Sequence, residues 1–586
     1  MAVPMRTHYA GDLRAEHEEH EVALCGWVSR ERDHGGVLFI DLRDREGVAQ
    51  VVFHPQEAPE AHAVATDLKS ETVVRILGTV RRRPDGTVNP SLPTGEVEVA
   101  ASSVEVLSAA ETPPFPIEDD LQADERLRLR HRYLDLRRPR MTRLMRLRHR
   151  AIAAIHRYFD EHGFVEVETP MLTRSTPEGA RDFLVPSRLQ PGAFYALPQS
   201  PQIFKQILMV AGLDRYYQIV RCFRDEDLRA DRQPEFTQLD VEMSFVAEED
   251  VQALIEEMLA GVWKAVLDVD IPTPFPRLTY AEAMRRYGSD KPDTRYGMEL
   301  GDLSEAFAGT GFRAFAGVLD GGGVVKGFAA PGAAGWSRKD LDDLVVEAQG
   351  RGASGLVWMA FAGDEVKSPV AKFLSEEEVA AIRKETGAGE GDLALIVADT
   401  ESRANTVLDG LRRLMAERLS LVPEGRWDFL WITEPPVFEW SEDDERWVSV
   451  HHPFTAPATE DLAPETALAR AYDVVLNGWE LGGGSIRIHR RDVQRAVFDA
   501  LGLTKEEAEA KFGFLLEAFR YGVPPHGGIA FGIDRMAMLL AGESNIREVI
   551  AFPKTQSGAD LLTGAPAEVA DDQLRDLGLK LRGSKG

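Results

Sequence analysis

The chain has little cysteine and no long apolar segment. Its 586 residues contain two cysteines, Cys25 and Cys222, far apart in the sequence, which excludes a disulfide framework or a cysteine-rich zinc site and favours a reducing compartment. No run of ~18 apolar residues occurs, so we expect no membrane span and no membrane partner. The N-terminus lacks the hydrophobic region of a signal peptide, and no GxxxxGK(S/T) segment predicts a P-loop. These absences indicate a cytoplasmic protein.

Basic residues are also fewer than acidic ones. Lysine and arginine number 68 against 96 aspartate and glutamate residues, which gives a formal charge of −28. Such a charge argues against nonspecific nucleic-acid binding by the whole surface, but it leaves room for a local basic face. Arginine is dense in residues 126–150 and 81–83. From charge alone, these clusters fit solvated faces that balance acidic neighbours as well as contacts to RNA.

Hydrophobic patterning divides the chain into several domains. Apolar residues take every second position in short segments near the N-terminus, which predicts a small β-barrel or sandwich; five-stranded barrels commonly bind single-stranded nucleic acid. Helical spacing predicts a helix from about Thr142 to Gly163, followed by a strand in FVEVETPML. The expected domains are the barrel (1–110), a hinge or linker (111–138), a discontinuous catalytic domain of mixed helix and strand pattern (139–289 and 426–553), an inserted α+β domain (290–425) and a C-terminal extension (554–586).

One block, FRDEDLRADRQPEFTQLD at residues 223–240, combines several arginines and carboxylates with aromatic residues. Planar arginine groups suit phosphates and carboxylates, so Arg224 could hold a phosphate. Glu226 could accept a hydrogen bond from an amine, and Phe236 could stack on a base. A scaffold of ion pairs is the competing interpretation.

Two glycine-rich segments add further candidates. In YDVVLNGWELGGGSIRIH (472–489), Asp473 and Glu480 precede three glycines; two carboxylates facing a phosphate commonly hold Mg²⁺, which keeps several waters. In GGIAFGIDRMAML (527–539), a helix starts near Asp534 and could direct Arg535 at a phosphate. A tight turn and a surface arginine are the simpler alternatives. The paired histidines of VHHPFTAP lack the cysteine or HExxH context of a zinc site, so we expect no zinc.

Taken together, these segments resemble the class II aminoacyl-tRNA synthetases. FVEVETPML is similar to signature motif 1, the 223–240 block to motif 2 and GIAFGIDR to motif 3, whereas the class I signatures HIGH and KMSKS are absent. TPEGARDF, LPQSPQ, HHPFT and GGGSIRIH resemble the bacterial-type aspartyl-tRNA synthetases in particular, along essentially the whole chain. The resemblance implies an N-terminal OB-fold β-barrel, an antiparallel-sheet catalytic domain with helices, an inserted α+β domain, and a homodimer with Pro170 at its interface.

The resemblance also implies substrates and residue roles. ATP and L-aspartate would form aspartyl-adenylate with Mg²⁺ as cofactor, and a tRNA hydroxyl would then take the aspartyl group. The residues implied are Arg224 and Arg535 for catalysis; Glu178, Ser200, Gln202, Lys205, Arg224, Asp240, His451 and Arg487 for aspartate; Arg224, Asp225, Glu226, Gln233, Phe236, Glu480, Gly532, Ile533, Asp534 and Arg535 for ATP; and Asp473 with Glu480 for the metal.

Amino-acid specificity is expected at Arg487 and Lys205, facing the aspartate side chain with Asp240 orienting them. Asparagine would leave the arginine charge unpaired in a desolvated pocket, and such sites discriminate by roughly 10⁴–10⁵. Asparaginyl-tRNA synthetase is an alternative that the inserted domain and the GGGSIR arginine disfavour. A catalytically inactive RNA-binding paralogue is a second alternative, which the intact motif residues disfavour.

The resemblance places anticodon contacts in the barrel, where Phe39 would stack on a base and Gln50 would read a base edge. One family aromatic aligns with Val52, which departs from the pattern. His34 and Gly86 resemble relatives that charge both tRNA-Asp and tRNA-Asn, whereas strictly discriminating enzymes tend to carry Leu at the position of His34. We therefore expect both tRNAs as partners; neutral variation in a barrel loop, with strict tRNA-Asp specificity, is the alternative.

Overall fold

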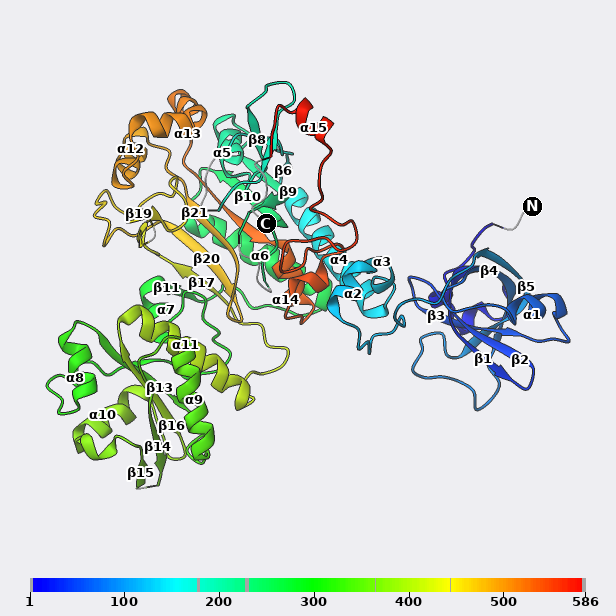
Figure 1. The fold of residues 1–586 in the computed structure, drawn as a ribbon, viewed down its shortest axis with the longest axis horizontal. Helices are drawn as coiled ribbons and strands as arrows, with labels where there is room; N and C mark the ends of the chain where they lie inside the picture. Colours follow the sequence, from blue (N-terminus) through cyan, green and yellow to red (C-terminus); the bar gives the residue numbers. More distant parts are fainter. Residues whose placement is uncertain (1–3, 176–179, 227–230, 364, 443, 582–586) are drawn as a thin grey trace. The chain divides into compact units, whose positions relative to one another are not determined.

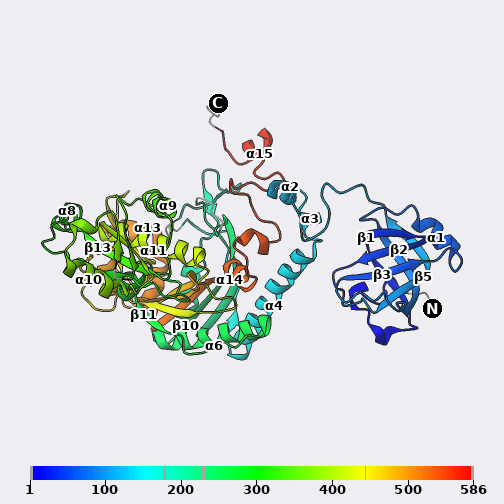
Figure 2. The same cartoon turned by 90° about the horizontal axis from the view of Figure 1, so that it is seen from below.

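The computed structural model describes residues 4–175, 180–226, 231–363, 365–442 and 444–581. The chain forms two compact units. The first comprises residues 1–150, 227–234 and 537–571, and the second comprises residues 151–226, 235–536 and 572–586. Figures 1 and 2 show the path of the chain through the elements described below. No helix among the described residues is both long and apolar enough to cross a membrane.

The first unit contains a closed five-stranded barrel with the strand order β1-β2-β3-β5-β4. Its strands are β1 (Glu21–His34), β2 (Val37–Arg43), β3 (Val48–Phe53), β4 (Val73–Arg82) and β5 (Val97–Ser108), with helix α1 at Pro59–Ala65. Leu24, Ile40, Val51 and Ile76 fill the interior and are fully buried. The barrel prediction from period-two hydrophobicity is confirmed, because alternate side chains of each strand face one core.

The segment after the barrel is more ordered than a simple linker. It contains α2 (Glu125–Arg130) and α3 (Arg132–Asp135) and leads into α4 (Pro139–Glu161). Helix α4 begins at Pro139 instead of near Thr142, and proline suits a first helical position because its φ angle is already helical. The predicted end at Gly163 is close to the observed one, and Gly163 adopts a φ of +72°.

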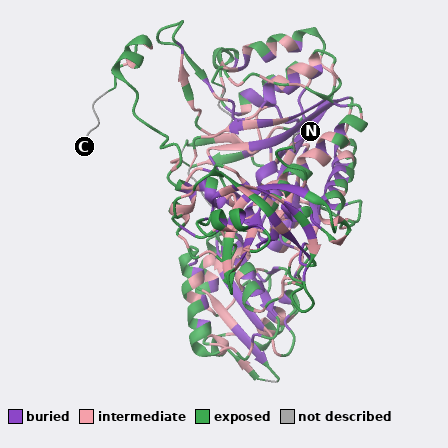
Figure 3. Cartoon of the chain, turned by 90° about the vertical axis from the view of Figure 1, so that its right-hand side faces the viewer, coloured by how far each residue is buried: buried purple, intermediate pink, exposed green. Residues whose placement is uncertain are grey.

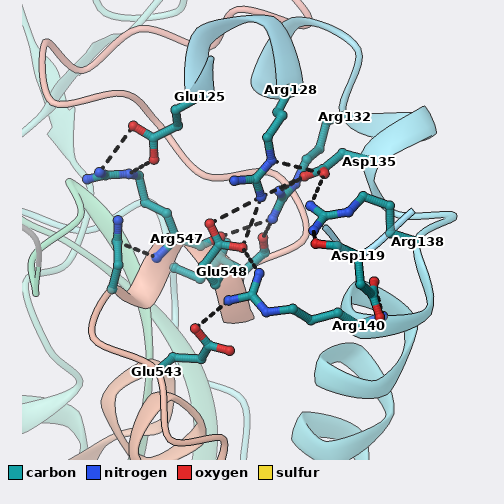
Figure 4. A network of polar contacts seen from close by, with 12 residues as sticks. Asp119, Glu125, Arg128, Arg132, Asp135, Arg138, Arg140, Glu543, Arg547 and Glu548 are labelled. Carbon is teal, nitrogen blue, oxygen red and sulfur yellow. Dashed lines mark hydrogen bonds and ion pairs between the residues drawn. The ribbon is translucent and has the colours of Figure 1, made fainter. Parts of the chain in front are cut away.

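Arginines of this segment form a buried network with carboxylates (Figure 4). Asp135 is fully buried and pairs with Arg128 at 3.0 Å and with Arg138 at 2.8 Å. Glu548 pairs with Arg128 and Arg140, each at 3.0 Å. These arginines of the 126–150 run therefore join the linker helices to the 3₁₀ turn at Ile546–Val549, which favours the structural interpretation of this charge cluster over an RNA contact.

The second unit is built on an eight-stranded sheet with the order β11-β17-β20-β21-β22-β10-β9-β6. The strands are β6 (Val165–Glu166), β9 (Arg215–Phe223), β10 (Glu235–Ser244), β11 (Arg277–Thr279), β17 (Phe429–Thr433), β20 (Ala471–Leu476), β21 (Trp479–Ile486) and β22 (His526–Gly532). The central pairs from β17 to β9 are antiparallel, and only the edge pairs β11–β17 and β6–β9 are parallel. Most residues of the central strands β10, β17, β20 and β22 are buried, as the purple arrows of Figure 3 show, whereas the edge strand β6 is exposed.

Helices and short hairpins surround this sheet. They are α5 (Gln202–Val210), α6 (Glu248–Leu267), α7 (Tyr280–Tyr287), α12 (Arg491–Ala500), α13 (Lys505–Ala518), α14 (Ile533–Leu540), and the hairpins β7 (Leu184–Pro186) with β8 (Phe194–Ala196) and β18 (Phe438–Ser441) with β19 (Arg446–Ser449). A last short helix, α15 (Asp571–Asp576), has no buried residue. The predicted strand, glycine break and helix of GGIAFGIDRMAML is confirmed as β22 followed directly by α14.

A separate five-stranded sheet, of order β12-β13-β16-β14-β15, occupies the inserted segment. Its elements are β12 (Gly301–Asp302), α8 (Arg313–Asp320), β13 (Val324–Ala330), α9 (Arg338–Gly350), β14 (Val357–Ala362), β15 (Glu365–Lys367), α10 (Glu376–Thr386), β16 (Leu393–Asp399) and α11 (Glu401–Arg418). Leu344 and Leu411 pack in one hydrophobic cluster, and Phe315 and Ile382 in another. The sheet is thus covered by helices α9 and α11 on one face and by α8 and α10 on the other.

The FVEVETPML segment contains less strand than predicted. Only Val165–Glu166 is a strand, at the sheet edge, and Val165 and Leu172 remain 46% and 53% exposed. Pro170 is also exposed. The residues that follow keep only single contacts with β9, such as the Val167 N–H that donates to the carbonyl oxygen of Tyr217 at 3.3 Å. The expected dimer contact at Pro170 stays a prediction.

Candidate active site

A cavity of about 430 Å³ opens over the centre of the eight-stranded sheet. Strands β10, β20, β21 and β22 contribute side chains or glycines to its floor, and α5 contributes one wall. The lining residues are Ala180, Gln199, Ser200, Gln202, Lys205, Arg224, Glu226, Gln238, Asp240, Asp290, Val450, His451, His452, Asp473, Glu480, Gly483, Gly484, Ser485, Arg487 and Ala530.

Two buried cations and two buried carboxylates form a paired cluster at this cavity, and three of them, Lys205, Asp240 and Arg487, line it. Arg487 binds Glu242 through two hydrogen bonds, Nε–Oε1 at 2.9 Å and Nη2–Oε2 at 3.1 Å. Lys205 lies 3.0 Å from Asp240 Oδ1 and 3.4 Å from Glu242 Oε2. All four side chains are at most 2% exposed. The pairing is required because an unpaired charge at such a depth is strongly destabilising.

The two carboxylates respond differently to this burial. Burial opposes ionisation of Glu242, but the charges of Arg487 and Lys205 outweigh it and lower the pKa of Glu242. Burial raises the pKa of Asp240 in spite of Lys205. Gly528 of β22 lies directly behind Glu242, and a Cβ at that position would overlap Glu242 Oε2. The glycine therefore makes room for the carboxylate that holds Arg487.

Several polar atoms of the cavity wall have no protein partner among the described residues. They are Asp240 Oδ2, Gln202 Nε2 and His451 Nε2, and none of these atoms is accessible to solvent. Buried polar groups are normally hydrogen-bonded, so these atoms are available to a ligand. Arg487 Nη1 is already engaged, since it donates to His452 Nε2 at 2.8 Å and to Ser485 Oγ at 2.6 Å. His452 is thereby fixed beside the guanidinium.

A second pair of carboxylates lies on the β20–β21 hairpin. Asp473 pairs in register with Gly483, and Glu480 follows the turn. A Cβ on Gly483 would overlap Asp473 Oδ1 and would lie 3.9 Å from Glu480 Oε1, so both carboxylates converge over this glycine. Burial and the charge of Glu480 raise the pKa of Asp473 well above its usual value. Asp473 Oδ1 has no hydrogen-bond partner among the described residues.

The remaining predicted nucleotide residues surround this hairpin. Arg224 lies over the ring of Phe236, 5.1 Å from its centroid. Arg535 donates from Nη1 to the carbonyl oxygen of Glu480 at 2.6 Å. Asp534 accepts from the backbone N–H of Thr237 at 2.8 Å, which fixes the start of α14 to β10.

Comparison with known proteins agrees with this geometry. A family model described as "tRNA synthetases class II (D, K and N)" matches residues 124–556, and an "OB-fold nucleic acid binding domain" model matches residues 22–107. A protein of Moorella thermoacetica named Aspartate–tRNA(Asp/Asn) ligase is 58% identical, with 98% of this chain and 96% of the relative covered. A protein of the same name from Oleidesulfovibrio alaskensis is 56% identical over 98% and 95%.

The chain belongs to the class II tRNA synthetases. Both of these relatives carry a name that specifies aspartate and the tRNAs for aspartate and asparagine. The fold is also similar to that of an asparaginyl-tRNA synthetase from Pyrococcus horikoshii, solved with asparaginyl-adenylate. That structure has a TM-score of 0.59 and 19% identity, and 94% of this chain and 98% of that chain are covered.

Some predicted class II site residues lie outside the cavity wall. Gly532 and Ile533 form the junction of β22 and α14, and the backbone N–H of Asp225 donates to Arg181. The amide of Gln233 is engaged by the backbone of Lys554, accepting from its N–H at 2.7 Å and donating to its carbonyl at 3.1 Å. Glu178 lies outside the described residues.

The sequence interpretation missed Glu242, His452, Ser485 and Asp290. Asp240 was expected to orient both Arg487 and Lys205, but Arg487 donates its two carboxylate hydrogen bonds to Glu242. Glu242 could have been found, since residues two apart on a strand share one face. His452 adjoins a residue that was chosen. Asp290 begins the inserted segment, where no motif was recognised.

The predicted anticodon residues lie on or beside the barrel. His34 is exposed at the end of β1, and its ring is 5.7 Å from that of the half-buried Phe39 in an edge-on arrangement. Gln50 is 9% exposed and donates to Glu98 at 2.8 Å. Gly86, with a φ of +83°, occupies the third position of a turn closed by Thr87 N–H and the carbonyl of Pro84. That position of a type II turn favours glycine.

The partly buried His451, whose ring Nε2 is inaccessible to solvent, predicts a pH effect on stability. Burial, and next the charge of Arg487, lower the pKa of His451 to about 4. Because the unfolded side chain titrates near 6.5, the unfolded chain binds a proton that the folded chain does not as pH falls below that value. The free energy of unfolding of the wild type should therefore fall by about 3 kcal/mol more than that of His451→Gln between pH 7 and pH 4.

Urea unfolding followed by circular dichroism at both pH values measures this difference. His149→Gln, on an exposed position of α4, is the matched control and should follow the wild type. Equal losses in the wild type and His451→Gln would contradict the assignment of a buried neutral imidazole.

Proposed function

We propose that this chain ligates L-aspartate to tRNA at the expense of ATP, through aspartyl-adenylate. The main support for the proposal is the number of N–H donors that Arg487 and Lys205 leave unused. Arginine has five N–H donors and lysine three. Among the described residues, Arg487 uses four of its donors and Lys205 directs one at each of two carboxylates. One N–H on each cation remains for a substrate carboxylate.

Such a pair selects aspartate over asparagine. The side-chain carboxylate of aspartate accepts from both cations, whereas the amide of asparagine would direct an NH₂ group at one of them. Leaving a buried cation without its partner has a high free-energy cost. Glu242 keeps Arg487 in place, and Asp240 keeps Lys205 in place. The names of the relatives from Moorella thermoacetica and Oleidesulfovibrio alaskensis support aspartate as the amino acid.

In the first step, a carboxylate oxygen of aspartate attacks the α-phosphorus of ATP and the bond to pyrophosphate breaks. Ser200 and Gln202 line the cavity near Lys205 and hold the amino acid with Glu178 and His451. Arg224 neutralises the α-phosphate, Glu226 and Phe236 bind adenine, and Arg535 binds the γ-phosphate. Positioning and charge neutralisation account for most of such catalysis. In the second step a tRNA hydroxyl attacks the aspartyl carbonyl, and AMP leaves.

The residues present also fit Mg²⁺. Asp473 and Glu480 converge over Gly483, and Asp473 Oδ1 is buried without a hydrogen-bond partner among the described residues. A hard cation with oxygen ligands satisfies both features. Bound there, Mg²⁺ would neutralise the phosphate charge. The chain's own contribution is to hold the two carboxylates on one hairpin beside Arg535.

We also propose that the enzyme charges both tRNA-Asp and tRNA-Asn. The relatives named for both tRNAs support this, as does His34, which is exposed beside Phe39. Strict specificity for tRNA-Asp is the second candidate, since Gln50 is held by Glu98 and could read one base edge in a fixed orientation. An inactive RNA-binding paralogue is disfavoured by the paired Arg487, Lys205, Asp240 and Glu242.

Substitution of Arg487 tests the amino-acid assignment. Arg487→Leu removes the donor to the substrate carboxylate, so aspartate-dependent ATP–pyrophosphate exchange should fall by roughly 10⁴. Arg487→Lys, which keeps the charge but not the paired geometry, should fall less.

The matched control is Arg470→Leu, because Arg470 makes an equally paired contact with Glu248 at 2.6 and 2.7 Å away from the catalytic cavity. It should retain exchange. Near-normal exchange in a folded Arg487→Leu protein would overturn the assignment.

Aminoacylation of purified transcripts tests the tRNA assignment. The wild type should charge tRNA-Asp and tRNA-Asn at similar rates, and His34→Leu should slow tRNA-Asn charging by about tenfold, equivalent to a single base contact. Charging of tRNA-Asp by the variant is the internal control. Wild-type charging of tRNA-Asn hundreds of times slower than of tRNA-Asp would refute relaxed specificity.

We infer that two copies of the chain form a homodimer with Pro170 at the interface. The exposed Val165 and Leu172 on either side of it support this inference, because monomers seldom leave such apolar neighbours uncovered. Light scattering should give twice the 64.9 kDa chain mass, and Leu172→Glu should reduce it. A single-chain mass for the wild type would contradict the dimer.

A further inference from the structure

The inserted domain reaches the catalytic cavity through its first residues. Asp290 follows α7, begins the inserted segment and lines the cavity together with Asp473 and Glu480. Its carboxylate lies 3.4 Å from the amine of Lys291, and both side chains are about half exposed, at 47% and 45%. Neither residue belongs to a motif that the proposed reaction uses. A charged side chain from a separate domain is therefore placed in the active site.

A buried arginine of the inserted domain fixes this segment. Arg412 of α11 is fully buried and donates to the carbonyl oxygens of Tyr296, Gly297 and Met298 at 3.1, 3.2 and 3.1 Å, and to that of Asp293. Its guanidinium also lies over the Tyr296 ring, 4.6 Å from the centroid. Residues 293–298 thus have their backbone oxygens gathered around one side chain.

The same segment rests on the hairpin that carries the metal-site carboxylates. Gly478, at the β20–β21 turn, has a φ of +85°, and a Cβ there would lie 3.2 Å from Cβ of Asp293. Thr294 donates to Asp428 at 3.3 Å, just before β17. The residues that follow Asp290 are therefore anchored against the hairpin that carries Asp473 and Glu480.

The negative charge of Asp290 acts electrostatically on two other side chains that line the cavity. After burial and the charge of Glu480, it contributes to raising the pKa of Asp473, and Lys291 acts in the opposite direction. It also opposes the lowering of the pKa of His451. No group of three carboxylate, histidine or cysteine side chains with metal-site spacing occurs among the described residues, so Asp290 is not assigned as a direct ligand beside Asp473 and Glu480.

We propose that Asp290 accepts hydrogen bonds from water molecules on the divalent cation held by Asp473 and Glu480, and that Arg412 is the positioning residue that keeps Asp290 there. The inference rests on the proposed function. Mg²⁺ retains several waters in nucleotide sites and binds few protein ligands directly. A half-exposed carboxylate that lines the same cavity as the two ligands suits such waters. The inserted domain is then part of the metal site.

Substitution of Asp290 by asparagine tests this role, because it removes the negative charge and leaves the size of the side chain unchanged. Asp290→Asn should raise the half-saturating Mg²⁺ concentration in aspartate-dependent pyrophosphate exchange by about tenfold or more, as is usual for residues that support metal ligands. The KM for aspartate should not change. Mn²⁺ binding in the presence of a non-hydrolysable ATP analogue, measured by electron paramagnetic resonance, should weaken by the same factor without turnover.

Arg412→Met should weaken Mn²⁺ binding in the same direction, and the double variant should be no weaker than the stronger single variant if Arg412 acts through Asp290. Circular dichroism establishes whether Arg412→Met is folded, and Asp290→Asn alone decides the matter if it is not. Asp343→Asn, on an exposed position of α9, removes the same charge from the inserted domain outside the cavity and should match the wild type.

Unchanged Mn²⁺ binding in Asp290→Asn would overturn the inference, and so would a raised KM for aspartate with unchanged metal binding, which would assign Asp290 to the substrate ammonium group. A wild type without any aspartate-dependent exchange would instead overturn the proposed function, so the two failures are distinguishable.

Discussion

The hydrogen-bonded pair of Arg487 and Glu242 is the interaction on which the site depends. Both side chains are removed from water, and a buried charge pair contributes little net stability to a fold. Its contribution to the site is to orient the guanidinium of Arg487. Two hydrogen bonds from one carboxylate fix the plane of the guanidinium, and Ser485 and His452 fix its other side. The orientation of the donor that faces the cavity is therefore determined before any ligand enters.

Glycines on the neighbouring strands make that arrangement possible. Gly528 leaves space for Glu242, and Gly483 leaves space for Asp473. Gly484 lies so close to Gly528 that a side chain on it would overlap the backbone of β22. The GGGSIR segment is thus explained by close approach of strands and carboxylates and does not require unusual backbone angles, since none of its glycines adopts a positive φ. A glycine-rich strand interior is usually weak, and here the antiparallel neighbours on both sides compensate for that weakness.

The sequence predicted those parts of the molecule in which local pattern and chemistry coincide. Period-two apolar residues gave the barrel, and the resemblance of three motifs gave the class II sheet and most of the cavity wall, including Lys205 and Asp240. Glu242 was missed because it lies in a strand of buried residues, where a carboxylate has meaning only through a partner 245 residues away. Asp290 was missed for a related reason. Its position depends on Arg412, and no local pattern links the two. The charge run at 126–150 was ambiguous until its arginines could be paired with Asp135 and Glu548.

Three buried arginines have different roles, two of them structural and one at the cavity. Arg132 and Arg412 donate mainly to backbone carbonyl oxygens, those of Arg547 and Ile550 in one case and of residues 293–298 in the other. A guanidinium surrounded by carbonyl oxygens fixes the path of a chain segment, because each acceptor belongs to the backbone and cannot rotate away. Arg487 instead bonds to side chains and faces a cavity. The physical difference is in the surroundings: Arg132 and Arg412 are enclosed by acceptors of the chain itself and act as structural anchors, whereas the acceptors of Arg487 leave one N–H directed at the cavity.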